Sequence, residues 1–478
     1  MNPYYKYQTL KHTFITRAAK MLSDLREAVS GTEQDFTTGK LGRAVFLLSI
    51  PMALEMLMES VFAIVDIFFV SKLGPEAIAT VGLTESIITI VYALAVGLST
   101  ATSSLISRRI GEKNLEGAST AAFQAILTGI LISLFIAVPG VIFAKKLLLL
   151  MGASAVIVQE MWGFAAIMIG SNTVIMLLFI INAIFRSAGD AAVSMRVLWM
   201  ANLINIVLDP LLIFGWGPLP AFGVQGAAMA TSTGRGLAVL YQVYLLFRGK
   251  KRVQLHLRHI RIEWPVMSSL LKLALGGVSQ HIIATSSWII LIRIISVFGS
   301  IVVAGYTIAI RVVNFALLPS WGLSNAASTL VGQNLGARQP QRAERSVWIT
   351  GWINILFLGS IGMILLVFSD SFIRFFIQDP AVIAAGSVSL RIISIGFIAY
   401  GFGMVLVNAL NGAGDTFSPM LINIVCYWIL EIPLAWLLAV HAGLNESGVF
   451  IAIVIAETMM TLSAFWIFRK GKWKQKKV

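Results

Sequence analysis

The chain has 478 residues, of which 58% are hydrophobic and only 12% are charged. A soluble protein has too little interior to bury so much apolar surface, so the composition excludes a soluble globular enzyme and indicates a membrane protein with many spans. The net charge of +14 lies mainly in connections and tails, so we expect a lipid bilayer and not nucleic acid as its partner. The single cysteine, Cys426, excludes a disulfide framework and a Cys-based metal site.

Residues 1–40 are predicted to form a cytoplasmic N-terminal tail. They lack the apolar core of a signal peptide. Their basic residues alternate with apolar ones, which leaves two interpretations open: a partly disordered tail, or a short helix lying on the inner leaflet. The basic residues are Lys6, Lys11, Arg17, Lys20 and Arg26.

Twelve hydrophobic segments follow, each long enough to cross a bilayer. They lie at about 44–72, 77–107, 117–143, 156–184, 191–215, 223–247, 265–298, 301–332, 345–368, 381–410, 417–441 and 447–468. A basic linker at 248–263 divides them six and six. We therefore predict an all-α polytopic membrane protein with an N-lobe at 41–247, a C-lobe at 264–469 and a basic tail at 470–478.

Charge in the connections predicts the orientation. Basic residues gather in every second connection, including 248–261, and in the C-terminal tail, whereas the alternate connections hold few. Loops rich in Lys and Arg stay in the cytoplasm. Both termini are therefore predicted to be cytoplasmic, in a multi-pass protein of the plasma membrane.

The two halves contain an internal repeat. Residues 97–111, GLSTATSSLISRRIG, align without gaps on residues 322–336, GLSNAASTLVGQNLG, at an offset of 225. The same offset maps Gly74 onto Gly299 and the AGD sequence ending at Asp190 onto the one ending at Asp415. Six spans per half give both halves the same orientation, so we expect parallel repeats around a central cavity.

The first span, LSIPMALEMLMESVFAIVDIFFVSKLG, carries three carboxylates. Glu55, Glu59 and Asp66 fall within an arc of about 40° on one helix face. Each acid costs roughly 2.5–3.5 kcal/mol at the centre of a membrane helix, so this face should point to water, protein or an ion.

Motifs in the first and fifth spans resemble those of a known family. VDIFFVSKLG, with Pro51 fifteen residues before Asp66, resembles the first-helix signature of the multidrug and toxic compound extrusion (MATE) family. Asn205-x-x-x-Asp209-Pro210 resembles a fifth-span motif of its DNA-damage-inducible and archaeal branch, and Asn182 matches an asparagine of that branch's polar network. The resemblance implies twelve helices in two lobes and antiport driven by protons or sodium, without an organic cofactor. It marks Asp66, Asp209, Asn205 and Asn182 as cation-coupling residues.

The chain departs from the other large bacterial branch of the family, which has acids in spans seven and ten. Here those spans hold Gln280, His281 and Arg391 instead. A second ion site in the C-lobe is therefore in doubt, although Glu431 lies near the position that corresponds to the fifth-span motif.

Comparison of the halves supports the same assignment. At the 225 offset, Asp66, Asp209 and Asn205 each correspond to leucine, so packing shared by the lobes does not require them. Buried carboxyl groups are suited to carrying protons, and with Asn182 and backbone carbonyls the same oxygens could bind Na+. The alternative for Asp209 is a structural acid that holds the helix before Pro210.

Glu55 and Glu59 are additional to the family signature. They could line a substrate cavity, where Arg311 is a further candidate, or pair with a membrane arginine. Candidate partners are Arg235, Arg311 and Arg391.

Pro51 removes a backbone hydrogen bond, and we predict that it lets the first helix bend when Asp66 is protonated; the alternative is a static kink. Asp190 and Asp415 are interpreted as N-caps of spans five and eleven.

The sequence holds no HExxH, no GxxxxGK[ST] and no defensible catalytic triad, so we predict a transporter and not an enzyme. The predicted function is multidrug efflux by antiport, with amphipathic, cationic small molecules exchanged for H+ or Na+ by a monomer, a role that fits antibiotic resistance. A flippase for a lipid-linked saccharide is the alternative, because intramembrane arginines could bind phosphate.

Overall fold

The computed structural model describes residues 20, 22–31, 33–249 and 251–476. The prediction for the tail therefore falls partly outside the described residues, because Lys6, Lys11 and Arg17 are not among them. Residues 22–30 form a helix. Within the described ranges the chain is helical apart from connections and one isolated bridge between Trp216 and Leu219.

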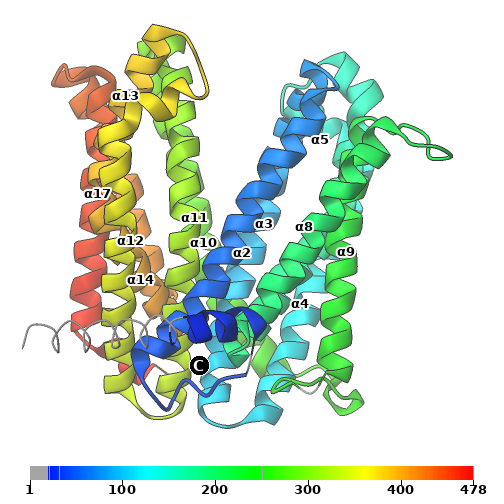
Figure 1. Cartoon of the computed structure of the whole chain (residues 1–478), viewed down its shortest axis with the longest axis vertical. Helices are drawn as coiled ribbons and strands as arrows, with labels where there is room; N and C mark the ends of the chain where they lie inside the picture. The colour runs from blue at the N-terminus through cyan, green and yellow to red at the C-terminus, as the bar shows by residue number, and fades with distance from the viewer. Residues whose placement is uncertain (1–19, 21, 32, 250, 477–478) are drawn as a thin grey trace, which may run out of the picture.

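The helices divide into two lobes that stand side by side (Figure 1). The first lobe contains α2 (Leu41–Ser71), α3 (Pro75–Gly111), α4 (Leu115–Ile142), α5 (Ala144–Leu150), η1 (Ile157–Met161), α6 (Trp162–Gly170), α7 (Asn172–Ala188), α8 (Ala191–Phe214) and α9 (Val224–Arg248). The short η2 (Leu257–His259) lies in the linker. The second lobe contains α10 (Trp264–Ile295), η3 (Ser296–Phe298), α11 (Ser300–Gly336), α12 (Pro340–Arg374), α13 (Pro380–Ile395), α14 (Phe397–Gly412), α15 (Phe417–Asn423), η4 (Ile424–Glu431), α16 (Ile432–Trp436), η5 (Leu437–His441) and α17 (Asn445–Arg469), followed by η6 (Lys472–Gln475).

Each predicted span corresponds to one helix or to a group of consecutive helices. Among the described residues, nine helices are long and apolar enough to cross a membrane, and α13 with α14, bent by 54°, makes a tenth. The two other spans are α2 and α9. They carry Glu55, Glu59 and Asp66 on α2 and Arg235 on α9, so the most charged part of the bundle lies in the first lobe.

The repeat is visible in the backbone. Helices α3 and α11 each have 37 residues, and their first residues are separated by the same offset of 225. The glycines that precede them, Gly74 and Gly299, have φ values of 103° and 102°, which favour glycine. Lys113 and Arg338, also 225 apart, both adopt the left-handed conformation. The two lobes are therefore built from equivalent turns as well as equivalent helices.

The lobes contact one another at the end of the molecule that carries the linker, which we call the basic end. Helix α2 packs on α11, and α3 packs on both α10 and α11. The repeated segments meet here at backbone distance: a Cβ atom on Gly111 would lie 1.9 Å from the Gln333 carbonyl oxygen, and one on Gly336 would lie 2.1 Å from that of Arg108. The small residues of the repeat thus allow the two lobes to close at this end.

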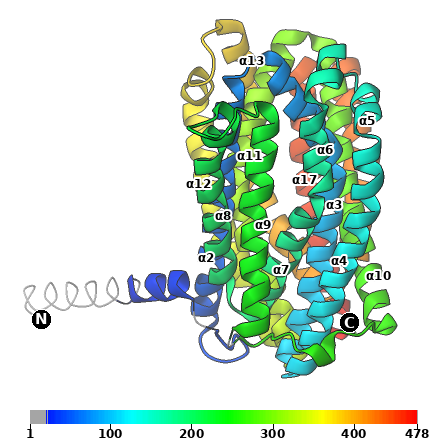
Figure 2. The ribbon, with the colours of Figure 1, turned by 90° about the vertical axis from the view of Figure 1, so that its right-hand side faces the viewer.

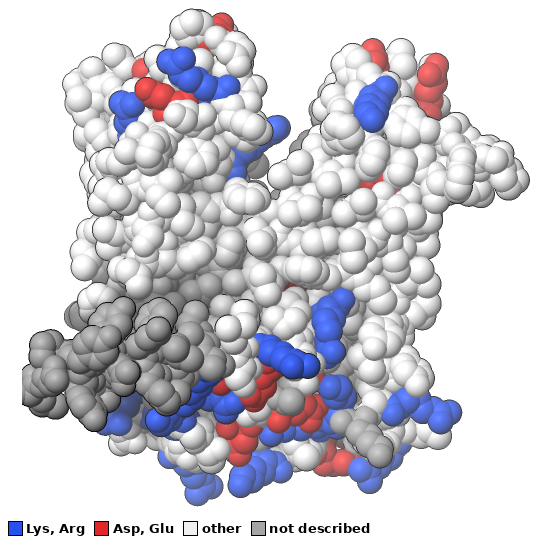
Figure 3. All heavy atoms as spheres, in the orientation of Figure 1, with Lys and Arg blue, Asp and Glu red and all other residues white. Residues whose placement is uncertain are grey.

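At the opposite end the lobes separate. Figure 3 shows an open cleft there between two largely uncharged walls, whereas Lys and Arg side chains gather at the basic end. The helices α8 and α9 lie side by side on the outer face of the first lobe (Figure 2). The structure is therefore closed at the basic end and open at the other.

Residues 33–39 form a strap across the basic end. On the first-lobe side, Arg252 donates its backbone N–H to Glu33 (2.9 Å) and its Nη1 to the carbonyl of Gln34 (2.8 Å). On the second-lobe side, Arg342 donates to the carbonyls of Thr38 (2.6 Å) and Gly39 (2.9 Å). The strap therefore binds both lobes while their basic ends are in contact.

The two aspartates predicted as N-caps differ. Asp190 does not cap α8 with its side chain; it pairs with Lys251 of the linker, which corrects the prediction. The N-cap residue of α15 is Thr416 and not Asp415, which corrects the second prediction by one residue. Asp415 accepts from the backbone N–H of Ser418 (3.4 Å) and from its hydroxyl (2.7 Å), and so satisfies one N–H of the first turn.

Helix α2 runs without interruption through Pro51, which is buried. Pro51 is thus accommodated within a single helix in this conformation. The predicted change in bend remains a prediction.

Candidate ion-coupling site

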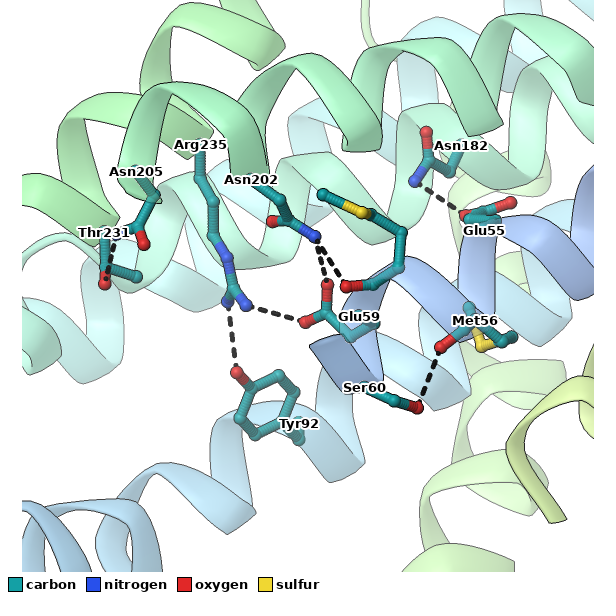
Figure 4. Close-up of polar contacts among 11 residues, drawn as sticks. Glu55, Met56, Glu59, Ser60, Tyr92, Asn182, Asn202, Asn205, Thr231 and Arg235 are labelled. Carbon is teal, nitrogen blue, oxygen red and sulfur yellow. Dashed lines mark hydrogen bonds and ion pairs between the residues drawn. The ribbon is translucent and has the colours of Figure 1, made fainter. Parts of the chain in front are cut away.

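Glu55 lies nearest the basic end of the acidic stripe and is neutralised. It is 1% exposed and accepts from Arg186 Nη1 at 2.8 Å and from Asn182 Nδ2 at 3.1 Å, both on α7. Figure 4 shows the contact with Asn182. A buried carboxylate needs such a partner because desolvation of an isolated charge is costly. Glu55 therefore does not line a substrate cavity, and its partner is none of the three arginines proposed from the sequence.

Glu59, one turn further along α2, is also paired. Its Oε1 accepts from Arg235 Nη2 on α9 at 2.7 Å, and Asn202 of α8 approaches the other oxygen at 3.4 Å (Figure 4). Arg235 is only 4% exposed, donates Nη1 to the Tyr92 hydroxyl at 3.1 Å and lies over the Phe62 ring, 5.2 Å from its centroid. Arg235 was one of the arginines that the sequence offered as partners for Glu55 and Glu59. About 30% of the Glu59 side chain stays exposed.

Asp66 differs from both glutamates. Among the described residues it has no hydrogen-bond or ion-pair partner, and its Oδ1 atom is shielded from solvent. The charges that influence it are the carboxylate of Glu85 on α3 and the guanidinium of Arg235. The aligned acids are therefore two fixed ion pairs and one unpaired carboxylate.

Asp209 on α8 is the second acid of the candidate site. It is fully buried, and the negative charge of Asp66 acts on it. Its polar neighbour is Asn205, one turn earlier on the same face. With both amide atoms satisfied, the Asn205 nitrogen donates to Asp209 Oδ2 at 2.9 Å, and its oxygen accepts from the Thr231 backbone N–H at 3.0 Å and hydroxyl at 3.1 Å. Asp209 is thus oriented by an amide, and no cationic side chain pairs with it among the described residues.

Asn182 lies with Glu55 and not with the aspartates. Besides donating to Glu55, it accepts from Gln242 Nε2 of α9 at 2.6 Å. In this conformation the four cation-coupling residues predicted from the sequence are thus not all in contact: Asn205 binds Asp209, the charge of Asp66 acts on Asp209, and Asn182 binds Glu55. Asn182 does not contact the two aspartates here.

The sequence interpretation did not single out several residues that orient these groups. They are Tyr92, Arg186, Asn202, Thr231 and Gln242. Four of them share one signal, a polar side chain inside an apolar span, where unsatisfied polar groups are costly. Arg186 lies two residues beyond its predicted span, in the last turn of α7. Thr231 and Arg235, one turn apart on α9, would have been the most informative pair.

The remaining intramembrane arginines have different surroundings. Arg391 donates to Ser369 (2.7 Å) and pairs with Asp370 (3.0 Å), so it binds neither glutamate of α2. Arg311 on α11 is exposed, and its charge acts on Glu85 of α3. The second lobe has buried acids of its own.

Glu431 accepts from Ser287 at 2.6 Å and Glu457 from Tyr427 at 3.1 Å. Both carboxylates lie outside the two spans in which the sequence comparison looked for acids.

This arrangement of two repeated six-span lobes with a cleft between them is that of a membrane transporter. The family model described as MatE matches residues 51–211 and 278–437, one block in each lobe. The chain belongs to the MatE family. Its members are transporters and not enzymes, and the chain is accordingly a small-molecule efflux transporter of the membrane.

Its relatives span nearly the whole chain. The probable multidrug resistance protein NorM of Thermotoga maritima is 24% identical over 92% of this chain and 94% of its own length. The FAD transporter of Shewanella oneidensis is 26% identical over 90% of this chain and 95% of its own length. A solved structure of the outward-facing conformation of a multidrug resistance MATE family transporter has a TM-score of 0.86 at 25% identity, covering 94% of this chain and 99% of that one. The twelve-span, two-lobe fold is thereby confirmed.

Proposed function

We propose that this transporter is an antiporter that exports amphipathic, cationic small molecules in exchange for inward-moving H+ or Na+. The observation that carries the proposal is the contrast within α2. Glu55 and Glu59 are neutralised by Arg186 and Arg235, whereas Asp66 has no hydrogen-bond or ion-pair partner in the described part of the chain. An unpaired carboxylate inside a membrane span is costly, and a bound cation removes that cost.

Asp66 and Asp209 form the coupling centre in this proposal. Two nearby carboxylates repel one another when both are charged, so the pair gains free energy from one proton or one sodium ion. Asn205 supports either ion, because its amide can donate to a carboxylate or be rotated to offer its oxygen. Asn182 belongs to a neighbouring cluster, in which it donates to Glu55 and accepts from Gln242.

The conformation supports a direction of transport. The basic end carries the linker and tail charges, and the positive-inside bias assigns it to the cytoplasm, together with both termini. The cleft then opens to the outside (Figure 3). In an alternating-access cycle this is the state in which substrate leaves and the coupling ion enters.

The flippase alternative has weaker support. It requires cationic groups that are free to bind phosphate. Of the three intramembrane arginines considered for that role, Arg235 pairs with Glu59 and Arg391 pairs with Asp370. Only Arg311 is left, and it faces the opposite charge of Glu85. Glu85 is exposed, and its negative charge favours a cationic substrate.

Flux in reconstituted vesicles tests the proposal. A dye such as ethidium should move against an imposed proton or sodium gradient, and Asp66→Asn or Asp209→Asn should abolish that movement while leaving the protein in the membrane. The matched control is Asp370→Asn, which removes a carboxylate from the second lobe. Undiminished gradient-driven flux in both coupling variants would refute the assignment, and collapsing each gradient separately identifies the ion.

A further inference from the structure

Arg235 is a buried cation whose hydrogen-bonding capacity is only partly used. Of its five N–H donors, one on Nη2 binds Glu59 and one on Nη1 binds Tyr92. Its Nε is buried and has no partner among the described residues. An arginine stays charged under all physiological conditions, so this residue is a permanent positive charge inside the first lobe.

The same charge acts on a second carboxylate, that of Asp66. Asp66 is seven residues from Glu59 on α2, which places it on the same face two turns away. The positive charge of Arg235 acts on Asp66 as well as on Glu59. The Oδ1 atom of Asp66 is buried and has no partner among the described residues. The charge of one fixed cation therefore acts both on a carboxylate that it binds and on another that it does not bind.

Besides Arg235, the one cation among the described charged and titratable groups around Asp66 is Arg311, which acts on Glu85. The groups that face Asp66 or its immediate neighbours are Glu59 on α2, Glu85 and Tyr92 on α3, Asp209 on α8, Arg235 on α9 and Arg311 on α11, the last facing Glu85. Arg235 is thus the cation of the same lobe that acts directly on Asp66.

We infer that Arg235 is a tethered counter-cation that competes with the transported coupling ion for Asp66. This inference rests on the proposed function of Asp66. When Asp66 is ionised and empty, the guanidinium is shared between Asp66 and Glu59. When H+ or Na+ binds at Asp66 and Asp209, Arg235 returns fully to Glu59 and Tyr92, which is the arrangement in Figure 4.

The consequence is that Arg235 sets the affinity of the site for its ion. A positive charge near the empty carboxylate stabilises the ion-free state, and so helps the ion to leave after it has crossed. Glu59 opposes this effect because it holds the guanidinium away from Asp66. Arg235 is in this sense a positioning residue, and Glu59 controls how much of its charge Asp66 experiences.

Substitution of the two residues should therefore change the affinity for the coupling ion in opposite directions. Arg235→Gln should lower the coupling-ion concentration needed for half-maximal occupancy by roughly tenfold, as expected for loss of one like charge in a medium of intermediate dielectric. Glu59→Gln should raise it, because the released guanidinium moves towards Asp66. Arg235→Lys should stay close to the unaltered protein, because it keeps the charge.

The experiment uses the full-length protein with two readouts. One is the initial rate of ethidium efflux from vesicles as the concentration of H+ or Na+ is varied. The other is titration of intrinsic tryptophan fluorescence with the same ion in detergent, which does not require transport. Arg391→Gln is the matched control, since it removes a membrane arginine from an ion pair in the other lobe.

The inference is supported if the ion concentration for half-maximal occupancy shifts in opposite directions in Arg235→Gln and Glu59→Gln and does not shift in Arg391→Gln. The inference is overturned if this concentration is the same in all variants, or shifts in the same direction in Arg235→Gln and Glu59→Gln, because a purely structural ion pair responds alike to loss of either partner. If Arg235→Gln fails to reach the membrane, the sign of the Glu59→Gln shift decides. Loss of ion dependence in efflux with opposite shifts in fluorescence would refute the proposed function and retain the role of Arg235.

Discussion

Glu59 and Asp66 share one face of α2, yet only Glu59 is bound by a cation. Its Oε1 lies 2.7 Å from Arg235 Nη2, whereas Asp66 Oδ1 is buried without a partner among the described residues. Two chemically similar carboxylates on one helix thus differ in their surroundings, because one of them is bound by an arginine from α9. The unpaired one is available to an ion, and the paired one holds the arginine in place.

The ion pair nearest the basic end should be structural. Glu55→Ala would leave Arg186 and Asn182 without their acceptor, and removal of one partner from a buried pair costs about 3 kcal/mol or more. We expect a lower midpoint of thermal unfolding in detergent, with the ion dependence of efflux unchanged in the protein that remains folded. Glu160→Ala, at an exposed position, is the control. An unchanged midpoint for Glu55→Ala would show that the pair contributes little.

The sequence predicted the repeat and the acidic stripe, because both depend on spacing along one chain. The offset of 225 aligned Gly74 with Gly299, and helical periodicity placed the three acids on one face. The sequence alone could not show which acid pairs with which arginine. Glu55 and Arg186 are 131 positions apart, and Glu59 and Arg235 are 176 apart. Their pairing depends on how α7 and α9 are rotated about their axes relative to α2, and spacing within one helix does not report that rotation.

The same limit explains the grouping of Asn182. Family resemblance placed it with Asp66, Asp209 and Asn205, all in one lobe. The rotation of α7 directs its amide to Glu55 and to Gln242 instead. Membership of a lobe could be predicted, but the contact could not.

The glycines at the ends of α3 and α11 should control closure of the basic end. Gly111→Ala and Gly336→Ala would each place a methyl group about 2 Å from a backbone carbonyl oxygen of the other lobe, far closer than atoms can approach. The lobes would then separate at this end, and the population should shift towards a state open there. The control is Gly236→Ala on α9, where a methyl group meets nothing within 4 Å.

Cysteine labelling measures this shift. Cys426 is buried, so a cysteine introduced at the interface of α3 and α11 reports on its own accessibility. Faster labelling in the Gly111→Ala and Gly336→Ala proteins than in the Gly236→Ala protein is the expected result. Equal labelling rates would mean that the backbone contact is not needed for closure.

The strap should stabilise the same closed end. Arg342→Ala removes donors to the carbonyls of Thr38 and Gly39, and so detaches the strap from the second lobe. Each hydrogen bond from a charged donor contributes about 1.5–3 kcal/mol, so the basic end should open more often. Arg345→Ala, an exposed arginine one turn later, is the control.

Proteolysis and hydrogen exchange of residues 33–39 provide the measurement. Exchange should become faster in Arg342→Ala and stay unchanged in Arg345→Ala. Burial raises the pKa of Glu33 in this strap, so its ionised form is disfavoured when the strap is docked. The docked state then binds more protons than the free one, and docking should strengthen as pH falls through that raised pKa. Exchange that is slower at high pH, after correction for its intrinsic rate, would contradict this expectation.

Pro51 provides the last test, because it separates bending from coupling. The proline lies inside α2, four residues before Glu55 and fifteen before Asp66, and removes one backbone hydrogen bond from the helix. If protonation at Asp66 acts through a bend at this position, Pro51→Ala should stiffen α2 and slow efflux several-fold, while the ion concentration for half-maximal fluorescence change stays the same. Binding is then preserved and only the conformational step is impaired. Gly236→Ala again serves as the control, since it alters a membrane helix of the same lobe without a contact. Turnover at the unaltered rate in Pro51→Ala would establish a static kink and leave the Asp66–Asp209 centre to act through other contacts of α2.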